Sequence, residues 1–355
     1  MKFPVYAKKY IPNINNAIKL IFDSKLNDVE NPFLKDYYSE LSDYFLSGGK
    51  RIRPLLCIAT YNAFHNNQDN SIVHPSVGVE FLHNATLIHD DIIDRDDFRR
   101  GKPSFHFRFR NYHKQYKLKK MNASDFGVSI GLIGGDSVFI MGLEAFLFNE
   151  FKRDLNLKAI KYYEQGFIEI INGVLIETDM VNRKDLTISD YIKMISLKTG
   201  ALIEKSILIG ANYAEVETKF LKDLSRYGLN LGIIFQIIDD ILGTFGDEKV
   251  TGKPTDGDIR EGKQTCLLIT ALNNLENEKR EKLESLIENP NMTNENVKEV
   301  KDLFRDANVI DSCKKLANNY YQEAKSSLEN LKAEIKTSEA EFFASLLDFV
   351  MNRKF

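Results

Sequence analysis

The longest proline-free stretch of this chain runs from residue 104 to residue 253, between Pro103 and Pro254. Proline removes a backbone hydrogen-bond donor and clashes with the preceding turn, so a chain that avoids it over such a length can form long helices. Apolar residues in this stretch recur three and four positions apart, which places them on one face of a helix. No convincing alternation of apolar and polar residues indicates a strand, and the pattern therefore predicts an all-α fold. Two such faces comprise Tyr191, Met194, Ile195 and Lys198, and Leu229, Ile233, Gln236 and Asp240.

The helical pattern covers most of the chain. The segments 72–93, 126–152 and 214–243 consist mostly of apolar turns, which is typical of helices in the centre of a bundle. No linker, low-complexity segment or internal repeat divides the sequence, so we expect one all-α domain over residues 1–355. The basic and aromatic segment Arg108–Lys120 is expected to form an exposed loop. Helices are expected over residues 13–24, 34–46, 51–65, 72–93, 126–152, 155–181, 188–211, 214–243 and 262–275, with shorter ones to the C-terminus.

Composition narrows the class of protein. The formal net charge is −3, so no global basic field indicates a nucleic-acid partner. Cys57, Cys266 and Cys313 have neither zinc-ligand nor redox spacing, which favours reduced thiols. No run approaches the roughly 18 uninterrupted apolar residues of a membrane span, and Met1–Pro4 lacks the apolar stretch of a secretory signal. We therefore expect a soluble, cytoplasmic protein without a membrane span.

Three carboxylates crowd into five residues at Asp90, Asp91 and Asp94, and a cationic segment with Arg99 and Arg100 follows. Asp90 and Asp94 are four residues apart and share a helix face. Hard divalent ions, Mg²⁺ above all, bind carboxylate oxygens together with substrate phosphates. Arginine side chains present forked donors that match phosphate oxygens. The segment indicates a site for a Mg²⁺-bound diphosphate, although an isolated acidic run is more often solvated surface.

A second acidic segment of the same type lies far downstream. Gln236, Asp239 and Asp240 end an apolar helical stretch, and cationic, glycine-bearing sequence with Lys253 and Lys263 follows. Each acidic helix end is followed by basic sequence. This repeated pattern predicts that the two helix ends form two walls of one cavity, and not two unrelated surface patches.

Three further positions combine with these segments. Lys50 and Arg53 follow two glycines at the start of a helix and can gather around an anion, or they are ordinary surface cations. His83 lies two turns before Asp90 and is either a diphosphate contact or a satisfied core histidine. Lys198 lies in an apolar helix, where it needs an anion or a carboxylate partner.

In order, these segments are Gly-Gly-Lys-x-x-Arg-Pro, His-Asp-Asp-x-x-Asp with Arg-Arg-Gly-Lys-Pro, Lys-Thr-Gly, Phe-Gln-x-x-Asp-Asp, Gly-Lys-Pro and Asp-x-x-Glu-Gly-Lys. With them the chain closely resembles the trans-isoprenyl (polyprenyl) diphosphate synthase family, over nearly its full length. The resemblance implies a bundle of long helices around a deep apolar cavity, usually in a homodimer. It also implies Mg²⁺-assisted ionisation of an allylic diphosphate, condensation with isopentenyl diphosphate, and loss of a proton.

The resemblance assigns a role to each site residue. It implies that Asp90, Asp94 and Asp239 bind Mg²⁺, with Asp91 and Asp240 as close supports of the catalytic group that also contains Lys198. Isopentenyl diphosphate would be held by Lys50, Arg53, His83 and Arg100. The allylic diphosphate would contact Arg99, Lys198, Thr199, Gln236, Lys253 and Lys263.

The chain departs from the family pattern in its second acidic segment. Many members carry a third aspartate where this chain has Gly243, and we expect Asp247 to compensate from the next turn. The Asp-Asp-Ile-Leu-Gly form resembles archaeal-type members, so we do not interpret the change as inactivation.

Product length depends on side chains one and two turns before Asp90. Ala85 and Thr86 are small where farnesyl-forming members commonly place bulky aromatics, while Phe81 and Leu82 lie a further turn away. The resemblance to geranylgeranyl diphosphate synthases of archaeal type therefore favours a geranylgeranyl or longer product. A farnesyl diphosphate synthase and a non-catalytic regulatory subunit of a heteromeric synthase are the alternatives.

Two other classes are less consistent with the sequence. A class I terpene cyclase would share the first aspartate segment but usually carries a different second metal motif, and it needs no site for isopentenyl diphosphate. A helical scaffold with acidic patches would bind no diphosphate in a Mg²⁺-dependent way.

Overall fold

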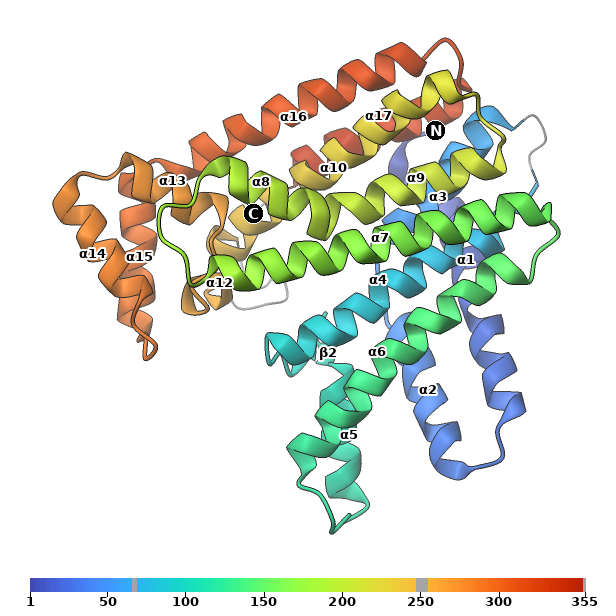
Figure 1. Ribbon diagram of the computed structural model, residues 1–355, viewed down its shortest axis with the longest axis horizontal. Coiled ribbons are helices and arrows are strands. Elements are labelled where there is room, and N and C mark those ends of the chain that lie inside the picture. Colours follow the sequence, from blue (N-terminus) through green and yellow to red (C-terminus); the bar gives the residue numbers. More distant parts are fainter. Residues whose placement is uncertain (66–68, 247–254, 354–355) are drawn as a thin grey trace. The chain divides into compact units, whose positions relative to one another are not determined.

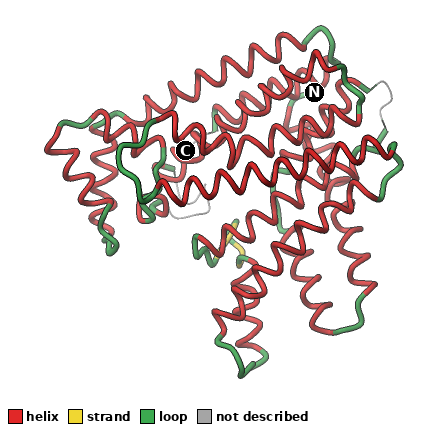
Figure 2. The backbone as a smooth tube through the Cα atoms, in the orientation of Figure 1, coloured by secondary structure: helices red, strands yellow, loops and turns green. Residues whose placement is uncertain are grey.

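A computed structural model describes residues 1–65, 69–246 and 255–353. The chain folds almost entirely into helices, as the sequence predicted, and Figure 2 shows one short strand pair between them. The residues group into two compact units, each with most of its contacts inside itself. Unit 1 comprises residues 1–164 and 206–217, and unit 2 comprises residues 165–205 and 218–355.

Unit 1 is built around α4 and α6 (Figure 1). The two helices approach closely because α6 carries glycines: a Cβ added at Gly135 would lie 2.1 Å from Nε2 of His89. The elements are α1 (Phe3–Asp28), α2 (Pro32–Leu46), α3 (Ile52–Phe64), α4 (Val73–Ile93), β1 (Phe98–Arg99), β2 (Lys102–Pro103), α5 (Phe105–Gln115), α6 (Ala123–Leu147), the start of α7 (Arg153–Met180) and the end of α9 (Ala201–Tyr213).

Unit 2 surrounds α10, which packs mainly against α16. The rest of α7 and α9 belongs to this unit. Its other elements are α8 (Ile188–Ile195), the π-helical turn η1 (Ser196–Gly200), α10 (Thr218–Phe245), α12 (Gly257–Arg260), α13 (Cys266–Asn274), α14 (Asn277–Ile287), α15 (Asn294–Asp306), α16 (Val309–Leu331) and α17 (Thr337–Met351).

The predicted helices agree with these elements within a few residues, with two exceptions. The first helix begins at Phe3 instead of residue 13. Neither of its prolines ends it, since Pro4 lies in the first turn and Pro12 lies within the helix. The loop expected over Arg108–Lys120 is wrong in its first half, since residues 105–115 form α5. Its buried side chains Phe105 and Phe109 recur four residues apart, which is a helical pattern that the basic residues between them obscured.

In the part of the chain that the structure describes, two helices, α6 and α10, are long and apolar enough to cross a membrane by length and composition alone. In α10 most of the apolar window is buried inside the protein, as in the core helix of a bundle. In α6 a smaller share is buried. The three cysteines are free and buried.

Candidate active site

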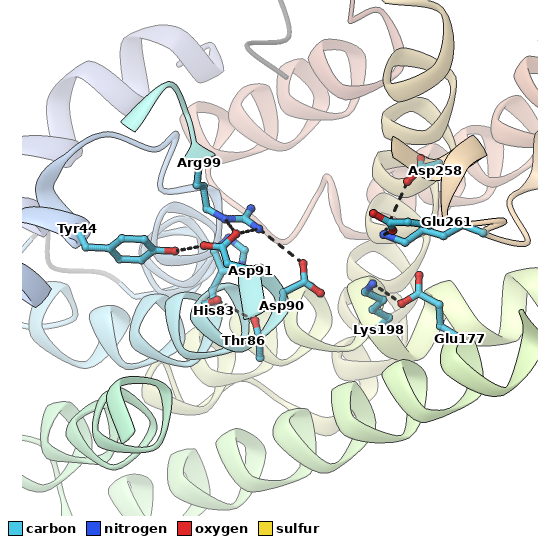
Figure 3. A network of polar contacts seen from close by, with 11 residues as sticks. Tyr44, His83, Thr86, Asp90, Asp91, Arg99, Glu177, Lys198, Asp258 and Glu261 are labelled. Carbon is cyan, nitrogen blue, oxygen red and sulfur yellow. Dashed lines mark hydrogen bonds and ion pairs between the residues drawn. The ribbon is translucent and has the colours of Figure 1, made fainter. Parts of the chain in front are cut away.

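The first acidic cluster lies where α4 ends. Asp90 and Asp91 belong to the last helical turn, and Asp94 caps the helix. Arg95 then adopts a positive φ of 58°, and the β1–β2 hairpin brings Arg99 back to the carboxylates. Nη2 of Arg99 lies 3.7 Å from Oδ2 of Asp90. The structure therefore joins the predicted cation to the predicted acids within unit 1 (Figure 3).

The two adjacent aspartates have different surroundings. Asp91 is fully buried and accepts hydrogen bonds from Nε of Arg99 at 2.6 Å and from the Tyr44 hydroxyl at 3.3 Å. Burial, together with the charge of Asp91, raises the pKa of Tyr44, so its phenol remains a donor. Asp90 keeps 28% of its side chain exposed. Asp91 thus holds Arg99 in place, while Asp90 remains accessible to a ligand.

A group of cations surrounds His83, two turns before Asp90. Burial lowers the pKa of His83 well below its usual value, and the charges of Arg53, Arg100 and Arg99 lower it further. Arg100 is held by a hydrogen bond from Nη1 to the carbonyl of Gly48 at 2.9 Å. Because these positive charges act on the imidazole of His83, an anion such as a diphosphate would be favoured there.

The cations after Gly48 and Gly49 are not equivalent. Arg51 is buried, and its Nη1 lies 2.7 Å from Oε1 of Glu80. Its Nε also donates to Oδ1 of Asn15 at 3.0 Å. Lys50 is exposed and Arg53 is partly buried. Arg51 therefore anchors the segment inside unit 1, and Lys50 and Arg53 remain the candidates for substrate binding.

The second acidic cluster lies near the end of α10 in unit 2. Asp240 is buried and accepts hydrogen bonds from the Tyr191 hydroxyl at 2.7 Å and from Nε2 of Gln236 at 2.8 Å. Gln236 is fixed in turn because its Oε1 accepts a hydrogen bond from Oγ1 of Thr199 at 2.7 Å. The predicted residues Thr199, Gln236 and Asp240 therefore form one continuous chain of hydrogen bonds.

Asp258 lies next to Gly243, the position where many members of the resembled family carry a third aspartate. A Cβ added at Gly243 would lie 3.3 Å from Oδ2 of Asp258. Burial raises the pKa of Asp240 to about 8, and the charge of Asp258 is the next largest cause. Nζ of Lys263 lies 3.8 Å from Oδ1 of Asp258 and 2.8 Å from Oε2 of Glu261. A carboxylate therefore lies beside Gly243, although position 243 itself carries none.

Asp239 contacts the C-terminal segment. Nη1 of Arg353 forms an ion pair with Oδ1 of Asp239, and the guanidinium carbon lies 4.5 Å from the centroid of the Phe235 ring. The side chain of Asp239 is 40% exposed. A cation of the protein itself therefore lies on the carboxylate that the sequence assigned to Mg²⁺.

The sequence predicted either a bound anion or a carboxylate partner for Lys198, and the structure shows a carboxylate partner. Its Nζ lies 2.5 Å from Oε2 of Glu177 on α7 (Figure 3). The backbone of η1 approaches α7 so closely that a Cβ at Gly173 would lie 2.4 Å from the amide nitrogen of Lys198. Glycine at position 173 therefore permits the pairing.

Four predicted chain-length residues lie on α4 but not on one face. Thr86 is partly buried, like His83 and Asp90 on the same face. Phe81 and Leu82 are fully buried, and Ala85 is nearly so. The Cβ of Phe81 lies 3.0 Å from a Cβ added at Gly142, so this side of the helix packs against α6. Ala85, four residues after Phe81, shares that side.

Some functional candidates could not be found from sequence, and two fall outside the structure. Asp247 and Lys253 lie outside the described residues. Tyr44, Glu177, Tyr191 and Arg353 carry no signature that links them to their distant partners. Asp258 belongs to a motif that the sequence revealed, but its proximity to Gly243 follows only from the fold.

The residues present fit a hard divalent cation. No group of three or more His, Cys, Asp or Glu arranged to hold a metal is found among the residues that the structure describes. The donors in each cluster are nevertheless carboxylate oxygens, the ligands that Mg²⁺ prefers. The raised pKa of Asp240 reflects burial beside like charges, and a bound cation would offset that repulsion.

An all-α fold with two acidic clusters, each beside cations, is consistent with an enzyme that acts on diphosphate substrates. A sequence profile described as polyprenyl synthetase matches residues 35–305. The chain belongs to this family and is a trans-prenyltransferase of isoprenoid biosynthesis.

Relatives and solved structures agree with this assignment. The chain is 32% identical over 293 residues to a short chain isoprenyl diphosphate synthase of Methanocaldococcus jannaschii, covering 81% of this chain and 84% of the relative. It is 31% identical over 339 residues to the geranylgeranyl diphosphate synthase of Saccharolobus solfataricus, covering 94% and 93%.

A crystal structure of geranylgeranyl pyrophosphate synthase from Corynebacterium glutamicum, complexed with isoprenyl diphosphate and magnesium, has the same fold. Its TM-score is 0.90, with 24% identity, over 98% of this chain and 99% of that one.

Proposed function

We propose that this prenyltransferase joins isopentenyl diphosphate head to tail to dimethylallyl, geranyl or farnesyl diphosphate and releases geranylgeranyl diphosphate or a longer product. The observation that carries the proposal is that unit 1 contains two groups: the accessible Asp90 beside Arg99, and the cations near His83. One group suits a metal-bound diphosphate and the other suits a second anion. A head-to-tail synthase needs both, whereas a terpene cyclase needs only the first.

Asp90, Asp94 and Asp239 are the proposed Mg²⁺ ligands, and Asp258 supplies a further carboxylate in place of the missing aspartate. Bound Mg²⁺ would stabilise the negative charge on the departing diphosphate. As donors to the allylic diphosphate we assign Arg99 in unit 1 and Lys198 and Lys263 in unit 2. Lys253, assigned to the same role, lies outside the described residues. Thr199 and Gln236 would orient the diphosphate. Lys50, Arg53, His83 and Arg100 hold isopentenyl diphosphate.

The proposed reaction needs no nucleophilic side chain. The allylic C–O bond breaks with its electrons going to the diphosphate. The double bond of isopentenyl diphosphate then forms the new C–C bond, and the released diphosphate takes the proton that is lost. The role of the protein is to bind, orient and exclude water.

The long product is supported by the small size of Thr86, which shares a helix face with Asp90 and would obstruct a growing chain less than an aromatic side chain would. The named relative from Saccharolobus solfataricus is a geranylgeranyl diphosphate synthase, which is consistent with the same length.

Purified protein with Mg²⁺, isopentenyl diphosphate and each allylic primer in turn tests the activity. Chromatography of the dephosphorylated products should show geranylgeraniol or longer alcohols. Farnesol alone would instead identify a farnesyl diphosphate synthase, and no elongation with any primer would favour the regulatory subunit.

The metal-binding assignment has its own test. We expect Asp258→Asn to weaken Mg²⁺-dependent binding of inorganic diphosphate, measured by calorimetry, by about tenfold. The exposed Asp154 on α7 provides a matched control, and Asp154→Asn should leave binding unchanged. Equal binding by both variants would exclude Asp258 from the site.

We also propose a cytoplasmic homodimer. Its support is a set of exposed apolar side chains along α6, which a second copy would cover. A molar mass of one chain by light scattering at micromolar concentration would contradict the dimer. The residues are Leu132, Ile133, Ile140 and Leu147.

A further inference from the structure

The turn between α5 and α6 in unit 1 presents a compact basic surface that the proposed reaction does not use. Helix α5 ends at Gln115, and Lys117 follows with a positive φ of 51°. The amide of Leu118 donates to the carbonyl of His113 at 3.1 Å, and that of Lys117 donates to Lys114 at 3.2 Å. These two bonds form a Schellman motif, so the turn has a defined shape instead of being a loose loop.

The far end of the turn is fixed as well. Asn122 caps α6, and its Oδ1 accepts a hydrogen bond from the amide of Asp125 at 2.8 Å. The segment 114–121 is therefore held between two helix ends, and Figure 1 shows it where α5 and α6 meet, away from α4. We call this segment the basic turn.

The basic turn carries positive charges and no negative ones. No acidic residue occurs between Asp97 and Asp125, although the whole chain has a net charge of −3. The four lysines of the turn are exposed, and among the described residues no carboxylate forms an ion pair with any of them. They are Lys114, Lys117, Lys119 and Lys120.

The carboxylates of neighbouring elements are already engaged by other side chains. Arg108 pairs with Glu40 at 2.8 Å and with Asp43 at 2.7 Å, and Arg110 pairs with Asp97. The Tyr112 hydroxyl donates to Asp36 at 3.3 Å. Among the described residues, none of these four carboxylates forms an ion pair with a lysine of the turn.

Apolar side chains lie between the lysines. Tyr116 is 53% exposed, Leu118 is 40% exposed and Met121 is 46% exposed. Leu118 follows the Schellman turn, where an apolar side chain frequently packs back onto its helix, yet much of it faces solvent here. Cations alternating with exposed apolar groups match the boundary between anionic lipid headgroups and acyl chains.

We propose that the basic turn docks the enzyme onto an anionic lipid bilayer. The lysines approach acidic headgroups while Tyr116, Leu118 and Met121 enter the interfacial layer. A duplex nucleic acid would match the lysines but would leave the three apolar side chains exposed to water. Docking goes beyond the proposed reaction, whose product carries a long hydrocarbon chain that a bilayer accepts.

Vesicle flotation with the full-length protein tests the docking. Wild type should float with vesicles of phosphatidylcholine mixed with phosphatidylglycerol, and should float little with phosphatidylcholine alone. Each lysine near an anionic surface contributes about a fivefold change in binding, so Lys117→Gln, Lys119→Gln and Lys120→Gln together should weaken it about a hundredfold. Raising salt to about 0.5 M should also release the protein, because it screens the surface charge.

A matched variant removes equal charge elsewhere. Lys158→Gln, Lys315→Gln and Lys325→Gln change three exposed lysines on α7 and α16 and should float like wild type. Leu118→Asn with Met121→Asn should weaken binding while keeping its salt dependence, since only the apolar contacts are lost.

Three outcomes would overturn the proposal. The first is that wild type does not bind anionic vesicles at low salt. The second is that the two triple variants lose vesicle binding equally. The third is that the protein binds duplex DNA through the basic turn but does not bind vesicles. Product formation in detergent-free solution serves as the folding control, because none of these residues belongs to the proposed active site.

Discussion

Replacing Glu80 with alanine should destabilise unit 1 far more than loss of an ordinary ion pair. The side chains of Arg51 and Glu80 are 1% and 3% exposed, and their charged atoms lie 2.7 Å apart. After Glu80→Ala, Arg51 would keep the carbonyl of Phe45 and the amide oxygen of Asn15 as acceptors but would lose its counter-charge. Leaving one charge of a buried pair uncompensated costs about 3–5 kcal/mol.

Urea unfolding followed by circular dichroism measures this cost from the midpoint and slope. An exposed pair provides the control: Lys282 and Glu299 lie 2.5 Å apart, with 54% and 40% exposure, and Glu299→Ala should cost less than about 1 kcal/mol. The double variant Glu80→Ala with Arg51→Met should recover most of the loss, since no charge stays buried. A cost for Glu80→Ala no larger than that of the control would refute the reasoning.

Three other changes give separate tests. Arg353→Ala should lower the half-saturating Mg²⁺ concentration, by up to about fivefold, because it removes the cation on Asp239; an unchanged or higher requirement would exclude such competition. Because the folded-state pKa of His83 is depressed, its contribution to stability is present above about pH 6.5 and is lost as the pH falls, at up to about 1.4 kcal/mol per pH unit. Urea unfolding between about pH 6.5 and 5 should therefore show a shallower loss in His83→Gln, and parallel curves would contradict this. Ala85→Phe and Thr86→Phe should both shorten the main product by chromatography, but Ala85→Phe should also lower stability by about 1–3 kcal/mol, since Ala85 is buried beside α6; unchanged product length in both would remove α4 as the determinant.

Helix α4 shows what the sequence could establish. Its predicted range, 72–93, differs from Val73–Ile93 by one residue. This helix is mostly buried along its length and ends at the three aspartates, so burial sets its length and charge sets its end. Helix α5 shows the opposite case. Its two buried phenylalanines lie among basic residues, and the charge pattern alone favoured a loop.

The candidate site divides in the same way. The candidate metal-binding and phosphate-binding residues occur in short motifs, so they could be proposed before the fold was known. Their supports could not, since Tyr44 lies 47 residues from Asp91 and Tyr191 lies 49 residues from Asp240. Helical periodicity carries no information about such pairs, which are fixed only when distant helices pack.

The two tyrosines indicate a common construction for the acidic clusters. In each adjacent pair of aspartates the second is buried and accepts a hydrogen bond from a tyrosine hydroxyl. The first of each pair is more exposed and lies near an arginine, Arg99 in one cluster and Arg353 in the other. This arrangement recurs in two units that share no sequence repeat.

On the proposed metal assignment, such a division of roles would explain why each cluster carries two adjacent aspartates. A metal ligand has to be accessible and held in one orientation, and an exposed side chain alone does not satisfy the second requirement. Asp91 and Asp240 lie inside the protein, where their hydrogen bonds fix the end of the helix. Asp90 and Asp239 are thereby presented to solvent with their backbone already positioned. The missing aspartate at Gly243 is consistent with this interpretation, because a carboxylate from Asp258 reaches the same place while the buried support, Asp240, is retained.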